Sequence, residues 1–215
     1  MAFATDRDLL VLEPNLFRDI SFASQMLAGG TDGAVSGTSF SSASADFVAA
    51  GVAAGHVLLL NDLAVEIVGV VSATELTVSR LRAHVDDAAV PPPPGASIPY
   101  AVRSFRPQVE MMHRQVMRSA GIEPDGVGEP SDAATEVDVL NRDELAMVVS
   151  LGALESIFAS AASLLADEPY LRLRAASYRD RFSSARQRAR VRLDLDGDGV
   201  VDVVRHLNVV QFVRW

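Results

Sequence analysis

The first regular pattern along the chain is a series of short hydrophobic segments between residues 35 and 104, of which 76–81 alternates between hydrophobic and polar residues. These segments are rich in β-branched residues and are separated by turn-forming residues, as strands usually are. Four consecutive prolines at 91–94 exclude helix and central strand and indicate a stiff, extended connector. We therefore expect a small barrel of short strands. The expected strands are 35–42, 56–60, 65–71, 76–81 and 98–104, with one helical turn at 45–51.

After residue 106 the spacing of hydrophobic residues changes to that of helices. Pro107 suits a first helical turn and Gly121 suits the position just past a helix end, so we expect a helix between them. A second helix is expected at 143–166 and a third at 169–190, where hydrophobic residues recur every three or four positions. The short connection between the last two predicts an antiparallel hairpin.

The ends and the middle of the chain have weaker patterns. We interpret 9–12 as a strand, 15–27 as a short helix and the glycine-rich 29–33 as a turn. Residues 121–141, rich in Gly, Pro and Asp, are expected to form a long loop. The predicted organisation is an α+β fold in four parts: an N-terminal segment at 1–34, a β-barrel module at 35–104, a helical domain at 105–190 and an extended C-terminal arm at 191–215.

Composition narrows the function classes. The 215 residues are 49% hydrophobic, which supports a packed core and argues against wholesale disorder. The absence of cysteine excludes a disulfide scaffold and a thiolate metal site. A net charge of −9 argues against a simple nucleic-acid-binding domain, and the use of arginine without lysine is typical of a GC-rich genome. The first eight residues hold no apolar core of signal-peptide length, so no secretory signal is expected.

The expected helix at 143–166 is apolar enough to compare with a membrane span. Glu155 is the only charged residue between Leu145 and Ala166, and about 20 apolar residues can cross a bilayer. Several small polar residues interrupt the stretch, however, and alanine supplies much of the rest. We therefore expect the helix to be buried within the fold or between subunits, with no membrane partner.

The sharpest motif is an aspartate-rich run near the C-terminus. Carboxylates at positions 1, 3, 5 and 9 of the run, with the carbonyl at position 7, form a pattern that can surround a hard cation such as Ca²⁺. The motif resembles EF-hand loops, but Arg205 stands where an EF-hand has its bidentate Glu, and the flanks resemble strands. The alternative is a metal-free hairpin turn. The candidate ligands are Asp194, Asp196, Asp198, Val200 and Asp202.

The expected third helix carries rows of arginines, including Arg172, Arg179 and Arg186. Three interpretations stay open: a solvated helix face, a contact surface for an acidic partner or neighbouring subunit, and contact with a nucleic-acid backbone. The four histidines match no metalloprotease spacing, and no serine-elbow motif is present. We therefore expect a chain without catalytic residues, not an enzyme.

The order of these parts resembles the head-to-tail adaptor proteins of tailed bacteriophages and prophages. The resemblance covers most of the chain and rests on organisation more than on signature residues. The stretches that carry it are 45–55 (ADFVAAGVAAG) and 71–79 (VSATELTVS) in the barrel module, 104–107 (SFRP) before the first long helix, 178–182 (YRDRF) in the helix pair, and 192–199 (RLDLDGDG) before the last strand.

The resemblance implies a structural role in the neck of a virion assembled in the host cytoplasm. Such adaptors form a ring, usually of twelve subunits, beneath the portal protein, and they dock the stopper or next tail protein. The ring extends a channel through which DNA passes without specific binding. Under this hypothesis the ring or portal contacts are made by Arg172, Arg179, Arg186, Phe212 and Trp215.

Other functions stay open at this point. A stopper or tail terminator would also fit the barrel module, although the long helix pair favours an adaptor. A Ca²⁺-dependent surface or secreted binding module would fit the aspartate-rich run, although the missing signal peptide opposes it. In the adaptor interpretation no cofactor is required, and Ca²⁺ is the one candidate.

Overall fold

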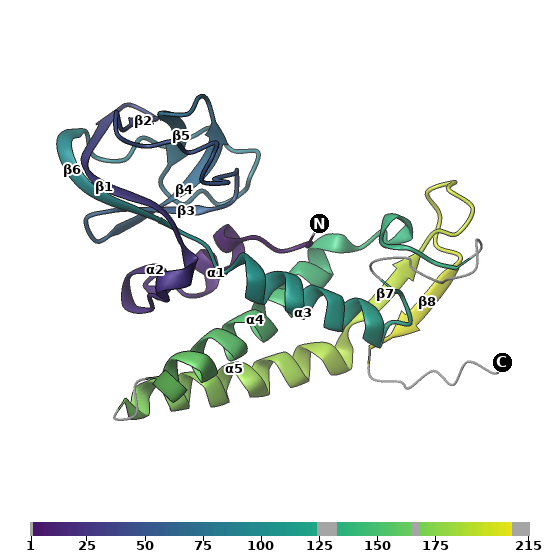
Figure 1. Ribbon diagram of the computed structural model, residues 1–215. Coiled ribbons are helices and arrows are strands. Elements are labelled where there is room, and N and C mark those ends of the chain that lie inside the picture. Colours follow the sequence, from purple (N-terminus) through teal and green to yellow (C-terminus); the bar gives the residue numbers. More distant parts are fainter. Residues whose placement is uncertain (1, 124–132, 165–167, 208–215) are drawn as a thin grey trace. The chain divides into compact units, whose positions relative to one another are not determined.

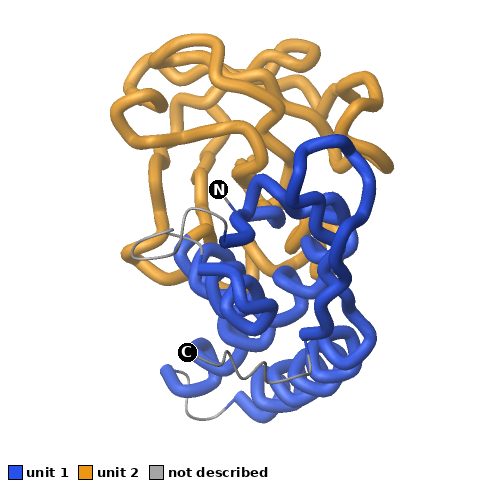
Figure 2. Tube along the Cα trace, turned by 90° about the vertical axis from the view of Figure 1, so that its right-hand side faces the viewer, with its two compact units in different colours: residues 1–4, 107–215 blue, residues 5–106 orange. Residues whose placement is uncertain are grey.

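The computed structural model describes residues 2–123, 133–164 and 168–207, and the chain forms two compact units (Figures 1 and 2). We call Thr5–Arg106 the barrel unit, and Met1–Ala4 with Pro107–Trp215 the helical unit. The chain therefore enters the barrel unit after Ala4 and leaves it after Arg106. The predicted α+β class is confirmed: a closed barrel of strands is followed by helices and a short C-terminal hairpin.

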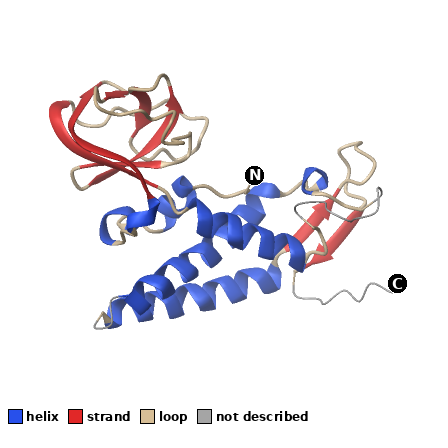
Figure 3. Cartoon of the chain, in the orientation of Figure 1, coloured by secondary structure: helices blue, strands red, loops and turns tan. Residues whose placement is uncertain are grey.

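Six antiparallel strands close the barrel in the order β1-β2-β5-β4-β3-β6, with β6 returning to pair with β1 (Figure 3). The expected strands from residue 56 onward lie within one to three residues of the observed ones. The prolines at 91–94 have no regular structure and lead directly into β6. The strand bounds are β1 Met26–Ser36, β2 Ser39–Ser41, β3 Val57–Leu60, β4 Leu63–Val70, β5 Glu75–Ser79 and β6 Gly95–Arg103.

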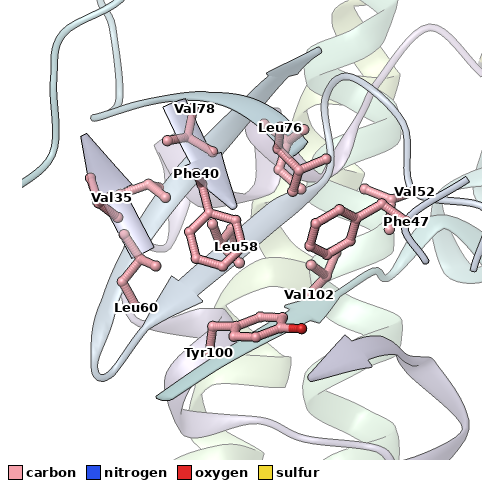
Figure 4. Close-up of a cluster of buried hydrophobic side chains, with 12 residues drawn as sticks. Val35, Phe40, Phe47, Val52, Leu58, Leu60, Leu76, Val78, Tyr100 and Val102 are labelled. Atoms are coloured by element: carbon pink, nitrogen blue, oxygen red, sulfur yellow. The ribbon is translucent and has the colours of Figure 1, made fainter. Parts of the chain in front are cut away.

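An aromatic trio fills the barrel core (Figure 4). The rings of Phe40, Phe47 and Tyr100 lie 5.0–6.2 Å apart and are surrounded by aliphatic side chains from several strands. Edge-on and tilted contacts at these distances stabilise a core beyond the area they bury. The ring of Phe40 also lies against the backbone of β1, where a Cβ on Gly33 would come within 2.8 Å of it.

The prediction of a turn at 29–33 is wrong, because these residues lie inside β1. Gly30 and Gly33 permit a close approach of the strand to Tyr100 and Phe40, so the glycines serve packing. The pairing of β1 with β6 also shifts register between residues 26 and 35, the part of β1 that contains these glycines. Glycine in this segment therefore indicates a tightly covered, irregular strand.

The N-terminal segment differs from expectation, and from Thr5 onward it lies in the barrel unit. The predicted strand at 9–12 is wrong, because it is the end of helix α1 (Asp6–Leu12), which begins with a capping box between Thr5 and Asp8. The predicted helix at 15–27 is wrong in length: helix α2 covers Leu16–Asp19, a 3₁₀ turn η1 follows at Ala23–Gln25, and β1 begins at Met26. Short helical elements therefore replace the strand and the longer helix expected.

The helical unit contains the three expected helices. They are α3 (Arg106–Ser119), α4 (Arg142–Leu164) and α5 (Pro169–Arg188), and a 3₁₀ turn η2 (Glu136–Asp138) lies within the expected loop. Helices α4 and α5 pack along their length as a hairpin, with the rings of Phe158 and Tyr178 stacked at 5.5 Å. Helix α3 reaches α4 where Met112 lies against Gly152.

Helix α4 is long and apolar enough to cross a membrane by length and composition alone, with a mean hydropathy of 1.8 in its most apolar window. In the fold, 67% of that window is buried. Burial on this scale is what the core helix of a folded domain shows. The expectation of a buried helix therefore agrees with the packing.

The C-terminal arm is, in its described part, a hairpin of β7 (Arg190–Leu193) and β8 (Val203–His206). Asn141, just before α4, holds β7: its side chain donates to the carbonyl of Arg190 at 2.7 Å and accepts from the amide of Arg192 at 2.9 Å. Arg205 of β8 donates to the carbonyl of Ala120 at 3.0 Å, beyond the end of α3. The predicted contact residues Phe212 and Trp215 lie outside the described residues.

Candidate functional site

The aspartate-rich run forms the loop between β7 and β8, and Asp194 organises it. Its Oδ1 accepts the backbone N–H groups of Gly197 at 2.7 Å and Asp198 at 3.2 Å, and its Oδ2 accepts that of Gly199 at 2.7 Å. Gly197 and Gly199 have φ angles of 80° and 83°, a region that favours glycine. The alternation of Asp and Gly in the sequence thus builds a tight loop around one buried carboxylate.

Hydrogen bonding keeps this carboxylate ionised. The amide of Gly199 first, and those of Gly197 and Asp198 next, lower the pKa of Asp194 below its ordinary value against an opposing effect of burial. At the other end of the loop, Oδ2 of Asp202 accepts the amide of Leu195 at 2.7 Å. Both ends of the loop are therefore fixed by charged acceptors.

Three of the five predicted ligands come together. Asp194, Asp196 and Asp202 each offer a carboxylate oxygen, and these oxygens lie within 4.8 Å of one another. Asp198 is not in this group and instead accepts the amide of Val200 at 2.7 Å. Three convergent carboxylates fit a hard cation such as Ca²⁺, which takes oxygen ligands and completes its shell with water.

The second predicted site, the arginine rows of α5, is divided by the structure. Arg172 and Arg179 border an open groove of about 410 Å³ between α4 and α5. Nε of Arg179 donates to Oε1 of Glu155 at 2.9 Å, and its side chain is 66% exposed. Arg186 lies differently, because its guanidinium covers the ring of Phe182 at 5.7 Å and its Nε is buried. Two of the three predicted arginines therefore share one surface.

A buried ion network in the barrel unit was not predicted. The carboxylate of Glu66, 1% exposed, accepts from Nε of Arg7 at 2.7 Å and from Nε of Arg82. Arg7 also donates to the carbonyl of Arg82 at 2.7 Å. The only signal in the sequence is a charged residue within an apolar strand, and it does not indicate the partners. The network joins α1 and the segment after β5 to β4.

No protein-family model, no curated protein and no solved structure matches this chain. The features of the chain that bear on its function are therefore the fold, the β7–β8 loop and the groove between α4 and α5.

Proposed function

We propose that this chain is a structural subunit, a head-to-tail adaptor of a tailed phage that forms a ring beneath the portal and docks the next neck or tail protein. The observation that carries the proposal is the surface of the α4–α5 hairpin. Large hydrophobic side chains are exposed near its tip: Leu164 at 70%, Leu173 at 72% and Tyr170 at 48%. Exposed apolar side chains among arginines are typical of protein interfaces.

The rest of the fold is compatible with assembly. Helix α4 buries large side chains such as Leu154 and Phe158 together with small residues such as Gly152 and Ala161, which suits a rigid hairpin that keeps its surface fixed. The net charge of −9 would let DNA slide past acidic surfaces of a channel without adhering to them. The barrel unit supplies a second compact body that neighbouring neck proteins can contact.

The test is native mass spectrometry of the purified protein, alone and after mixing with a portal ring from the same virion. An adaptor should add to the portal as a ring, expected to hold twelve copies by resemblance to the family. A monomer that ignores the portal would contradict the proposal. That result would favour a stopper, a tail terminator or a binding module.

A second candidate function is Ca²⁺ binding at the β7–β8 loop. It is favoured by the convergence of Asp194, Asp196 and Asp202. The two candidates are compatible, because a bound cation would stiffen a loop that lies at one end of the helical unit. Calcium titration against thermal stability tests this candidate separately, since a ligand that binds the native state raises the melting temperature.

A further inference from the structure

The groove between α4 and α5 has a particular chemistry. Its floor consists of small side chains, two of which, Ala162 and Ala175, are buried, and two arginines stand at its edge. Small residues leave room for an inserted side chain, and the arginines favour an acidic neighbour. Arg179 can bind one through the N–H groups other than the Nε–H that it donates to Glu155. We call it the alanine groove; it is lined by Ala159, Ala162, Ser163, Arg172, Ala175, Ala176 and Arg179.

The β7–β8 loop of the same chain has the complementary chemistry. Asp196 and Asp198 are exposed there, so their carboxylates can reach an arginine. Leu195, just before Asp196, is 48% exposed, and Val200, two residues after Asp198, is 61% exposed. The alanine groove would accept an apolar side chain flanked by carboxylates. The apolar side chain would lie on the small residues of the floor, and the carboxylates would pair with the arginines at the edge.

A loop cannot reach the groove of its own subunit. Asn141 holds β7 at the start of α4 through two hydrogen bonds. The groove begins at Ala159, 18 residues further along, which is about 27 Å of helix at 1.5 Å per residue. Figure 1 shows β7 and β8 at one end of the α4–α5 pair, away from the end where α4 finishes at Leu164 and α5 begins at Pro169. Any contact between loop and groove therefore joins two copies.

We infer that the β7–β8 loop of one subunit docks into the alanine groove of the next, with Asp196 and Asp198 facing Arg172 and Arg179 and an apolar side chain on the alanine floor. The inference rests on the proposed function, because it names the contact that would propagate the ring. A contact between two different surfaces is heterologous, and it generates a closed ring when the rotation between copies closes.

Cross-linking tests the contact directly, because the chain has no cysteine of its own. One preparation carries Ser163→Cys at the groove and the other carries Val200→Cys on the loop, and the two are mixed in EDTA with a short bismaleimide. We expect a heterodimer joining the two cysteines. The matched control replaces Ser163→Cys by Ser184→Cys, which is exposed on α5 outside the groove lining. Equal yields from the two mixtures would overturn the inference.

Charge reversal provides a second test of the same contact. Adding Arg172→Glu and Arg179→Glu to the groove preparation should lower the yield about tenfold, since two charge pairs are lost and replaced by repulsion. Adding Asp196→Arg and Asp198→Arg to the loop preparation should restore it. The control pair Arg174→Glu and Arg181→Glu makes the same change of charge on the same helix and should leave the yield unchanged. Loss of cross-linking in that control, or no rescue by the swap, contradicts the inference.

The outcome separates the two proposals. A ring that assembles on the portal without cross-linking between residues 163 and 200 overturns this contact and leaves the adaptor function standing. Cross-linked oligomers that ignore the portal support the contact and remove the adaptor function. No cross-linking and no ring would contradict both.

Discussion

Oδ1 of Asp6 accepts a hydrogen bond from the amide of Phe105, 2.8 Å away and 99 residues further along the chain. Asp6 is the second residue of the barrel unit and Phe105 the second from its end, so this bond joins the two ends of the unit. Asp6 as a whole is 2% exposed, and its Oδ2 has no hydrogen-bond partner among the described residues. Burial is the largest cause that raises the pKa of Asp6 from 3.8 to about 7.

The barrel unit should therefore lose stability as the pH rises from about 4 to 7. The folded state binds this proton more tightly than the unfolded chain, so the stabilisation is complete below the ordinary pKa and is lost as the pH passes the folded value. A difference of about three pKa units corresponds to about 4 kcal/mol. Asp6→Asn cannot ionise and keeps an oxygen for Phe105. Urea titrations measure the unfolding free energy of the variant and of the wild type. The difference, variant minus wild type, should increase by up to this amount between pH 4 and pH 8.

The control for this prediction is Asp19→Asn, which changes an exposed carboxylate on α2 in the same unit. It should not reproduce the gain. Parallel stability curves for the wild type and Asp6→Asn across this pH range would show that the buried carboxyl does not titrate as proposed.

Glu66→Gln should destabilise the barrel unit by about 3–5 kcal/mol, because it leaves two poorly exposed arginines without their shared carboxylate. Urea unfolding at neutral pH measures the change. Glu75→Gln is the matched control, since Glu75 of β5 accepts a single, partly buried hydrogen bond from Ser39 of the neighbouring strand β2 at 2.7 Å. We expect it to cost about 1 kcal/mol. Equal losses in the two variants would mean that the network contributes no more than one ordinary hydrogen bond.

The strands and long helices could be predicted because their patterns are local. A run rich in β-branched residues locates β4, alternation locates β5, and Pro107 and Pro169 lie in the first turns of α3 and α5. The misassigned segments are those where a local pattern has two meanings. The four apolar residues 9–12 suit a buried helix and a buried strand equally well. Gly33 suggests a turn in the sequence, and only the structure shows that the ring of Phe40 packs against it.

For the candidate sites too, local sequence patterns predict some features and only the fold shows the others. The spacing of the aspartates indicates a cation loop, but only the fold shows that Asp198 turns to the amide of Val200. A seven-residue interval groups Arg186 with Arg179, whereas the ring of Phe182 one turn earlier draws Arg186 away. The partners of Glu66 lie 59 and 16 residues away, and no local pattern indicates pairings at such separations.

Gly152→Ala should destabilise the helical unit by about 1–3 kcal/mol through overpacking. A Cβ at this position would lie 2.6 Å from the sulfur and 2.7 Å from Cγ of Met112, so the buried Met112 side chain must move. Thermal unfolding measures the loss. In the background of Met112→Ala the same substitution should cost little, because the side chain that meets the new methyl group is gone. Additive losses in the double variant would contradict this account of the contact.

Removal of Ca²⁺ should separate the two roles of the aspartate loop. If the cation binds, adding it to the EDTA-treated wild type should raise the melting temperature, and Asp196→Asn should abolish the rise while changing the metal-free protein little. Asp194→Asn should weaken the hairpin with or without Ca²⁺, because it weakens the acceptor of three backbone amides. Since hydrogen bonds lower the pKa of Asp194, its stabilising charge should be present at neutral pH and lost only as the pH falls below the ordinary range of Asp. A wild type whose melting temperature is unchanged by millimolar Ca²⁺ would identify the run as a metal-free turn built around Asp194.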